Sequence, residues 1–402
     1  MSRYRGNVWR LFATQTLLSF ILWVPIWVVF LQQRGLSLTQ IGVLESFAWV
    51  LTAGLEVPTG AIADRWGRKA SIAMGAFVYA MAMFLILADA LSPAFLLGYA
   101  FWNSSLAFVS GADSALLYDS LRADGRAGEA AKQSGRYAAI QQAAQGIASL
   151  LGAALATIDI TLCFTLCGLG ALAASAIALT MKEPPHTDEE GEVRLGYWKN
   201  LQVAIGIAAR RPIVRALLLL GAMLLVVPLV VYYVLLQPYA LGVGLPLASL
   251  GIVVVGVQLT NVVASWLAHR TQGRIALTNV VTVGVAVLLI ASSGLALFPA
   301  IPTIALMLAV ALVPALCGPL LTARLNDLIP SAQRATILSL SALLFELGLA
   351  VAMPLLLTSA DRLGAPAAIG VSTAALAVTV LPFLYIWRTS ERPRPAVADR
   401  PG

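Results

Sequence analysis

Charged residues are scarce in this chain, and so are the side chains that most often bind metals or act as nucleophiles. Only 11% of the 402 residues are charged, and there are two histidines and three cysteines. The histidines, His186 and His269, fall in or beside expected loops, and no nucleophile–base pair or metal-ligand group accompanies them. We therefore expect no enzyme, no metal site and no cofactor.

The cysteines give no sign of a disulfide framework. Cys163, Cys167 and Cys317 all lie inside long apolar segments, where a thiol usually packs like a small hydrophobic side chain. We interpret Cys163 and Cys167, which are spaced i and i+4, as packing residues rather than metal ligands.

Hydrophobic residues dominate the composition. They make up 59% of the chain, and the mean hydropathy of +0.86 lies far outside the range of soluble globular proteins. The net charge of +7 does not indicate nucleic-acid binding, because the basic residues are scattered between apolar runs instead of forming one patch. The composition predicts an all-α membrane protein.

A membrane-spanning helix needs about 20 predominantly apolar residues. Twelve segments meet this requirement: 8–33, 39–59, 69–90, 93–119, 135–157, 160–181, 212–240, 247–269, 274–298, 301–327, 332–358 and 365–388. The first segment is too long for the core of a signal peptide and lacks a small-residue cleavage site, so we expect it to remain as a helix.

The basic residues predict the orientation. If the N-terminus is cytoplasmic, every lysine and arginine except Arg34 and Arg362 falls on the cytoplasmic side. Basic residues favour that side of a membrane. We therefore predict a multi-pass protein of the cytoplasmic (inner) membrane, with both termini in the cytoplasm.

A charged stretch between the second and third spans stands out. It reads Glu-Val-Pro-Thr-Gly-Ala-Ile-Ala-Asp-Arg-Trp-Gly-Arg-Lys over residues 56–69. Gly60 lets a neighbouring helix come close and Gly67 permits a turn with positive φ, while Asp64, Arg65 and Arg68 can pair with one another and with helix ends. This arrangement favours a gating motif over a catalytic centre.

The same positions resemble a family signature. Gly60, Asp64, Arg65, Gly67 and Arg68 match the pattern Gly-x-x-x-Asp-Arg/Lys-x-Gly-Arg/Lys, so the chain resembles the twelve-helix transporters of the major facilitator superfamily. The resemblance implies two pseudo-symmetric six-helix bundles around a central cavity. It also implies that Asp119, at the cytoplasmic end of the fourth span, joins Asp64 and Arg68 in a charge network that closes the inner gate.

Two departures from the family weigh against a specific assignment as a drug:proton antiporter. The fifth span lacks the pattern Gly-x-x-x-Gly-Pro-x-x-Gly-Gly that proton-driven drug exporters often carry, and the fourth span lacks an arginine that many relatives have.

We predict three parts: an N-terminal bundle over 1–182, a cytoplasmic linker over 183–211, and a C-terminal bundle with a short tail over 212–402. In the linker, Trp198, Leu201, Ile205 and Ala208 recur at helical spacing, which is typical of an amphipathic helix on the inner leaflet.

The second half of the chain repeats the first loosely. Gly273 and Arg274 keep part of the gating motif without its acid, and Gly318 to Asn326 has the spacing of Gly111 to Asp119. These echoes fit two six-helix halves that are related by a parallel repeat.

Three acids are candidates for proton coupling or substrate binding, because a carboxylate at membrane depth is costly unless it is paired, protonated or facing water. Glu346 falls near the bilayer midplane and is the first candidate, followed by Glu45 and Asp113. For each, a structural hydrogen-bonding role remains the alternative.

The cavity candidates are polar or aromatic side chains within spans. Gln141 and Gln145 share a helix face, which lines a cavity or joins two helices; an interfacial anchor is the alternative for Tyr233. The full set is Gln15, Trp23, Gln141, Gln145, Tyr233, Gln258 and Asn261.

We expect a monomeric secondary active transporter that exports a hydrophobic or amphipathic small molecule in exchange for protons. This expectation rests on interior positions that are aromatic, apolar and sparsely charged. Proton-coupled uptake of a small metabolite is the alternative, and a non-transporting membrane receptor or scaffold is an alternative of another class. The substrate cannot be read from the sequence.

Overall fold

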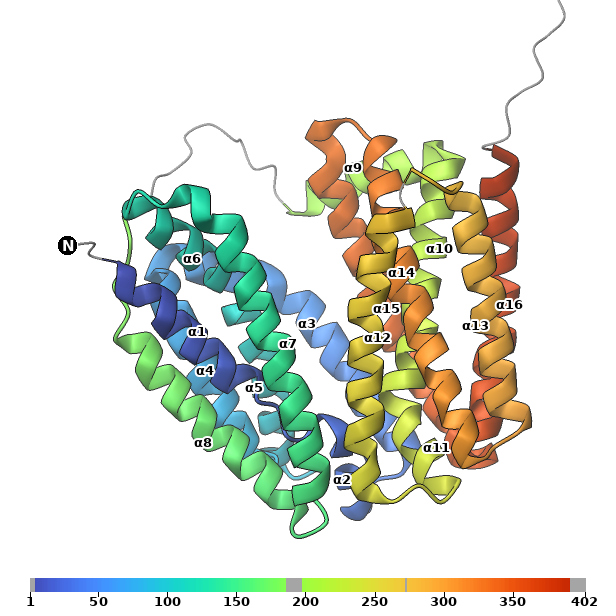
Figure 1. The fold of residues 1–402 in the computed structure, drawn as a ribbon, viewed down its shortest axis with the longest axis horizontal. Helices are drawn as coiled ribbons and strands as arrows, with labels where there is room; N and C mark the ends of the chain where they lie inside the picture. Colours follow the sequence, from blue (N-terminus) through green and yellow to red (C-terminus); the bar gives the residue numbers. More distant parts are fainter. Residues whose placement is uncertain (1–3, 186–196, 272, 391–402) are drawn as a thin grey trace, which may run out of the picture.

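Helices make up the structure, a computed structural model that describes residues 4–185, 197–271 and 273–390 (Figure 1). The side chains of residues 55–66 are outside the described part. Among the described residues there is no β-strand.

The first half of the chain forms one group of helices that pack mainly on one another. These are α1 (Arg5–Ser19), η1 (Val24–Ile26), α2 (Trp27–Gln33), α3 (Leu38–Trp66), α4 (Arg68–Leu85), α5 (Pro93–Val109), α6 (Ala112–Ala123), η2 (Ala127–Glu129), α7 (Ala130–Leu155) and α8 (Ile160–Leu179).

The second half follows helix α9 (Tyr197–Arg210) and forms the other group. It consists of α10 (Pro212–Leu229), η3 (Val230–Leu235), α11 (Leu236–Gly242), η4 (Leu247–Ser249), α12 (Leu250–Thr271), α13 (Leu277–Leu297), η5 (Ile301–Ala305), α14 (Leu306–Asp327), α15 (Ser331–Leu363) and α16 (Ala365–Ser390).

Each of the twelve predicted spans overlaps a helix or a run of consecutive helices. Within the described residues, nine helical segments are long and apolar enough to cross a membrane. The other three predicted spans correspond to α3, to α5 with α6, and to α7.

Three predicted spans depart from a regular α-helix in their interior. The first is interrupted over residues 20–23, just before Pro25, whose ring removes a backbone donor. The fourth breaks at Gly111, which has a φ of 81°. In the seventh, the π-helical segment η3 follows Pro228, because the missing N–H of proline disrupts the regular bonding of the helix.

The two halves meet at one end of the molecule. We call the end that carries Arg68, Arg126, Arg211 and Arg334 the basic end; the loops 34–37, 156–159 and 243–246 lie at the opposite end. Helix α3 packs along α15, and α7 packs along α12. Figure 1 shows the halves converging where α2 and α11 lie and diverging towards α6 and α9.

Two glycines allow the close approach of the halves. A Cβ on Gly42 of α3 would lie 2.8 Å from the Met353 carbonyl oxygen of α15. A Cβ on Gly251 of α12 would collide with the Ser149 carbonyl oxygen of α7. Without side chains at these positions, the backbones can come into contact.

The predicted linker helix is present as α9. Ala204 is fully buried, whereas Val203 and Ile205 are exposed, and the helix packs against α10 and α15. Residues 186–196, with His186, lie outside the described residues.

Candidate functional site

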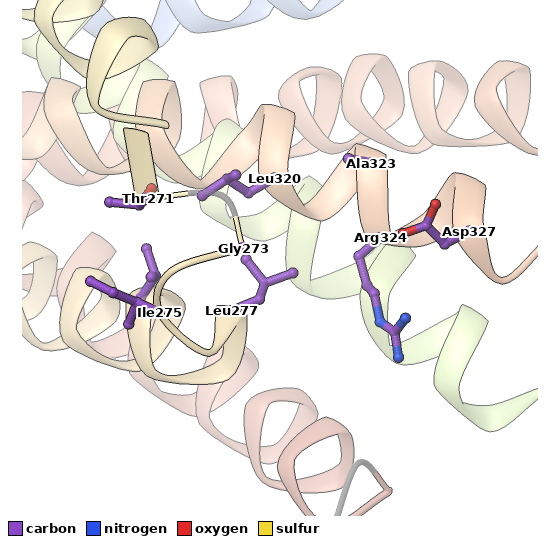
Figure 2. Close-up of a pocket in the computed structure, with 9 residues that line it drawn as sticks. Thr271, Gly273, Ile275, Leu277, Leu320, Ala323, Arg324 and Asp327 are labelled. Atoms are coloured by element: carbon purple, nitrogen blue, oxygen red, sulfur yellow. The ribbon is translucent and has the colours of Figure 1, made fainter. Parts of the chain in front are cut away.

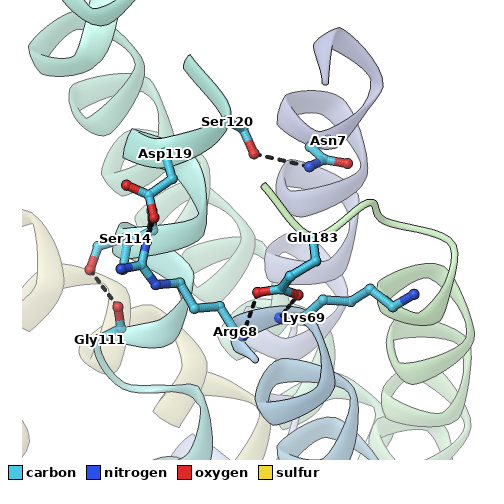
Figure 3. Close-up of polar contacts among 9 residues, drawn as sticks. Asn7, Arg68, Lys69, Gly111, Ser114, Asp119, Ser120 and Glu183 are labelled. Atoms are coloured by element: carbon cyan, nitrogen blue, oxygen red, sulfur yellow. Dashed lines mark hydrogen bonds and ion pairs between the residues drawn. The ribbon is translucent and has the colours of Figure 1, made fainter. Parts of the chain in front are cut away.

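The gating motif ends in a charge pair at the basic end. Arg68, the first residue of α4, forms an ion pair with Asp119 of α6, and its Nη1 also donates to the Ala115 carbonyl at 2.9 Å (Figure 3). A single guanidinium thus joins the start of the third span to the end of the fourth. The side chains of Gly60, Asp64 and Arg65 lie outside the described part of the structure.

A second acid holds the same turn. The Glu183 carboxylate accepts hydrogen bonds from the backbone N–H groups of Arg68, at 2.7 Å, and Lys69, at 3.0 Å. These donors belong to the first turn of α4, where a negative charge is stabilised by the helix dipole. Gly67 has a φ of 88°, and a Cβ there would lie 3.0 Å from the Glu183 carboxyl carbon. The turn therefore requires glycine for both reasons.

Asn7 of α1 connects this network to the end of α8. Its Nδ2 donates to the Ser120 hydroxyl at 2.9 Å and to the Lys182 carbonyl at 2.7 Å, and its Oδ1 accepts from the Lys182 N–H at 2.9 Å. Four spans of the first half, α1, α4, α6 and α8, are joined in this way.

Glu45 lies in the most aromatic part of the molecule. It is 5% exposed, and its Oε1 accepts from Trp27 Nε1 at 2.9 Å and from the Tyr99 hydroxyl at 2.8 Å. The Trp27 ring also contacts the rings of Trp23 and Trp102, with centroids 5.5 and 5.0 Å away. Both donors are neutral, so the carboxylate is buried with hydrogen bonds but without a cation on either donor.

Asp113 belongs to a different group of side chains. The Tyr137 hydroxyl lies 2.7 Å from Asp113 Oδ2 and 2.7 Å from Gln15 Oε1, and Gln15 Nε2 donates to Ser19 at 2.9 Å. A single O–H proton can donate to only one of the two oxygens. This chain of contacts therefore links Asp113 to the last turn of α1, next to the break in the first span.

Glu346 is buried on α15, with an exposure of 8%. The neighbouring Phe345 ring meets Trp49 of α3 edge-on, with centroids 5.8 Å apart. Glu346 therefore belongs to the helix that packs along α3 of the first half.

A cavity of about 640 Å³ lies in the second half, between α10, α12 and α14. Of the predicted cavity residues it contains Asn261; Ser265, Thr322 and Asn326 were not predicted. Asn326 Oδ1 is buried and has no hydrogen-bond partner among the described residues. No charged side chain lines this cavity in the described part of the chain, so it suits a neutral or apolar group.

The other predicted cavity residues lie elsewhere. Trp23 is 3% exposed and packed, with its indole N–H donating to the Tyr79 hydroxyl at 2.9 Å. Gln258 Oε1 of α12 faces Gly146 of α7, across the two halves. Gln141 and Gln145 of α7 and Tyr233 of η3 are half-buried.

The second half has no copy of the Arg68–Asp119 pair in the part that the structure describes. At the loop carrying Gly273, with a φ of 77°, the Arg270 guanidinium stacks on the Trp266 ring at 3.8 Å. A small cavity of about 120 Å³ lies between this loop and α14, lined by Arg324 and Asp327 (Figure 2).

At the opposite end, one amide bridges the halves. Gln237 of α11 accepts at Oε1 from the N–H groups of Val28, at 2.8 Å, and Val29, at 3.3 Å, and donates from Nε2 to the Val24 carbonyl at 3.1 Å. Gln237 is 2% exposed. It therefore satisfies the backbone groups released by the break in the first span.

Asp361 of α15 makes a second bridge. Its carboxylate accepts from the Thr39 hydroxyl at 2.8 Å and the Leu38 N–H at 3.3 Å, at the start of α3. Further along the same helices, the Ser46 hydroxyl donates to the Ala350 carbonyl at 2.5 Å. Together with Gln237, these hydrogen bonds join the two halves at and near the opposite end.

A family model described as Major Facilitator Superfamily matches residues 9–318. The chain belongs to this superfamily. Among curated proteins, no sequence gives a significant match.

Solved structures show the same superfamily fold. A nucleoside transporter, NupG (D323A mutant), aligns with a TM-score of 0.78 at 12% identity, covering 95% of this chain and 100% of that chain. A bacterial homologue of the human lysosomal transporter Spinster, in an inward-facing and unoccupied conformation, gives 0.72 at 17%, covering 97% and 98%. A D-xylose–proton symporter gives 0.66 at 15%, covering 95% and 96%.

Sequence reasoning missed several residues of this superfamily member's site. Glu183, Gln237 and Asp361 are not among the predicted site residues, because their partners, which are backbone groups and the Thr39 hydroxyl, are distant in sequence. One signal was present for Gln237: Pro25 predicts a break in the first span, and a break releases backbone groups that need a partner.

Proposed function

We propose that the protein is a secondary active transporter that moves a small molecule across the cytoplasmic membrane by alternating access. In this proposal the bundles 1–182 and 212–402 rock against each other around a central cavity, and the basic end faces the cytoplasm. Membership of the Major Facilitator Superfamily and the asymmetry of the basic residues support it.

The contacts between the halves support an inward-open conformation. Gln237 and Asp361 join the halves at the opposite end, whereas Arg68 and Asp119 pair within the first half. We propose that transport requires the first set to break while the gating motif and Asp119 close the cytoplasmic side together with the start of α15. That second state is the outward-open one.

We propose that transport is coupled to protons, and the observation that carries this is the environment of Glu45. Both of its donors bind Oε1 and both are neutral. A charged carboxylate buried among neutral groups is costly, so Glu45 carries a proton on Oε2 while it is enclosed in this way. In an exchange driven by protons, Glu45 binds this proton from the outside in the outward-open state, and its release towards the cytoplasm completes the inward movement of the proton. Glu346 and Asp113 remain the alternative carriers.

For the substrate, we propose export of a hydrophobic or amphipathic compound. The aromatic rings around Trp27 and the uncharged cavity beside Asn261 support this substrate class. Proton-coupled uptake of a small metabolite is the second candidate, which is supported by the fold shared with a D-xylose–proton symporter and a nucleoside transporter.

A thermal-shift panel of drugs, lipids, sugars, nucleosides and amino acids would identify a ligand, and counterflow in proteoliposomes would then separate a transporter from a receptor or scaffold. Glu45→Gln should abolish proton-driven accumulation but keep counterflow, because exchange needs no net proton movement. Proton-driven accumulation at the wild-type rate in Glu45→Gln would refute the assignment of Glu45.

Glu129→Gln is the matched control. Hydrogen bonds from Arg126 and Gln133 lower the pKa of the exposed Glu129 to about 2, so this carboxylate is ionised at any pH of the assay. The hydrogen bonds stabilise the charged carboxylate of Glu129, and this stabilisation is lost only when the pH falls to about 2 and the carboxylate is protonated. Its substitution should leave the pH dependence of flux unchanged.

A further inference from the structure

A third cavity, of about 590 Å³, lies at the basic end between α9 and the first turn of α15. Its polar lining comes from Arg210 and Arg211 and from the amides of Gln202 and Gln333. Val203 and Ile207 add an apolar part. It is separate from the cavity beside Asn261 and from the Glu45 group.

The charged side chains that line this cavity are both positive. No acidic side chain is among its lining residues in the described part of the chain. Arg211 is held in place because its Nη1 donates to the Leu328 carbonyl at 3.1 Å. Arg210 is exposed, as are Arg215 in the first turn of α10 and Arg334 in the first turn of α15. The site therefore presents donors and positive charge to an anion.

The apolar part belongs to the face of α9 that carries Val203 and Ile207, one turn apart. Val203 is 41% exposed and Ile207 is half-buried, while Ala204 is fully buried against the protein. A helix that packs on the protein with one side, and exposes apolar and basic side chains together, is suited to the boundary between lipid tails and headgroups. The basic side chains lie at the end where we place the cytoplasmic leaflet.

We propose that this cavity binds the phosphate of an anionic phospholipid from the cytoplasmic leaflet. Arg210 and Arg211 contact the phosphate oxygens, Gln202 and Gln333 contact the rest of the headgroup, and the acyl chains lie along Val203 and Ile207. Basic pockets between helices on this side of a membrane favour anionic headgroups, and guanidinium groups match phosphate geometry. A free phosphate ion would leave the apolar face exposed to water.

Native mass spectrometry of the full chain in detergent tests this proposal, with phosphatidylglycerol and phosphatidylcholine of identical acyl chains as probes. We expect tighter binding of phosphatidylglycerol. Arg210→Gln should weaken that binding about fivefold, and adding Arg211→Gln should weaken it about fivefold again, because one basic residue near an anionic surface contributes about that factor. Phosphatidylcholine binding should not change.

The controls exclude folding defects and a general charge effect. Arg274→Gln with Arg388→Gln removes two exposed arginines from the same end and should leave phosphatidylglycerol binding intact. The Arg210 side chain makes no hydrogen bond in the described structure, so Arg210→Gln should fold. If the double variant of Arg210 and Arg211 does not fold, the single variant Arg210→Gln still tests the proposal. Equal binding of the two lipids, equal loss in the control pair, or displacement of the lipid by inorganic phosphate would overturn the proposal.

Discussion

At the scale of single residues, polar side chains from one segment satisfy backbone groups of another. Gln237 fills the break in the first span, and Glu183 caps the first turn of α4. The N–H groups that Gln237 binds are buried, and a buried N–H without a partner costs about 1–3 kcal/mol. The contact of Gln237 therefore influences which conformation the protein adopts, whereas Glu183 stabilises the start of one helix.

Gln237→Ala leaves the N–H groups of Val28 and Val29 without their partner in the inward-open state. We expect a shift of about 1–3 kcal/mol towards the outward-open state. Maleimide labelling from the outside of a cysteine at Leu357, which is buried beside Gly42, measures this shift. Gln33, which is exposed at the end of α2, provides the control: Gln33→Ala should label as slowly as the parent.

Glu183→Ala removes the cap of α4. We expect a loss of about 1 kcal/mol in the free energy of unfolding and a lower midpoint in thermal unfolding. Glu183→Gln should recover part of the loss, because its amide oxygen still accepts hydrogen bonds but carries no charge. A thermal midpoint equal to wild type in the alanine variant would mean that the cap is not formed in solution.

At the scale of elements, the contact between α3 and α15 depends on a glycine, which has no side chain to hold the two backbones apart. Gly42 allows the two backbones to touch, and Ser46 and Trp49 continue the same contact towards the midplane. A well-packed interface of this kind cannot accept an added methyl without moving apart. The glycine thereby stabilises the conformation in which the opposite end is closed.

Gly42→Ala should separate the halves at that end at a cost of about 1–3 kcal/mol to the closed state. Spin labels at Gln33 and Leu363, measured by double electron–electron resonance, should report a longer mean distance. Gly54→Ala in the same helix is the matched control, since a Cβ at Gly54 meets no atom within 4 Å. An unchanged distance in Gly42→Ala would show that the contact between α3 and α15 does not set the separation of the halves at this end.

At the scale of the whole molecule, the two halves have similar helix arrangements but differ in the charged residues at the basic end. The first half has Arg68 paired with Asp119. At the related loop of the second half, Arg270 stacks on Trp266, and the position spaced like Asp119 is Asn326. If the two halves contributed equally to the gate, we would expect an arginine–aspartate pair in both.

We therefore expect Arg68→Gln to slow counterflow about tenfold or more, since each 1.4 kcal/mol of lost gate stability changes an equilibrium tenfold, while the protein remains folded. Arg274→Gln, at the corresponding position of the second half, should change the rate less than twofold. Similar losses in both variants would contradict an asymmetric gate. Asp64→Asn should behave like Arg68→Gln, as the family signature implies.

Much of the fold and part of the site were predictable. The apolar runs predicted the helices, because hydropathy is a local pattern. The resemblance to the major facilitator superfamily implied that Asp119 meets Arg68, and the structure pairs these two residues. The partners of Glu45 and Asp113 were not predictable. Trp27, Tyr99 and Tyr137 are ordinary aromatic residues in the sequence, and only packing brings their N–H and O–H groups to a carboxylate.

The sequence by itself determined the class of protein and the positions of the helices, since hydropathy and the turn requirements of glycine and proline act over short distances. The tertiary structure decided which carboxylate is buried among neutral donors and which amide closes the opposite end. Those properties depend on contacts between residues tens to hundreds of positions apart, such as Val28 with Gln237, and no local pattern specifies them.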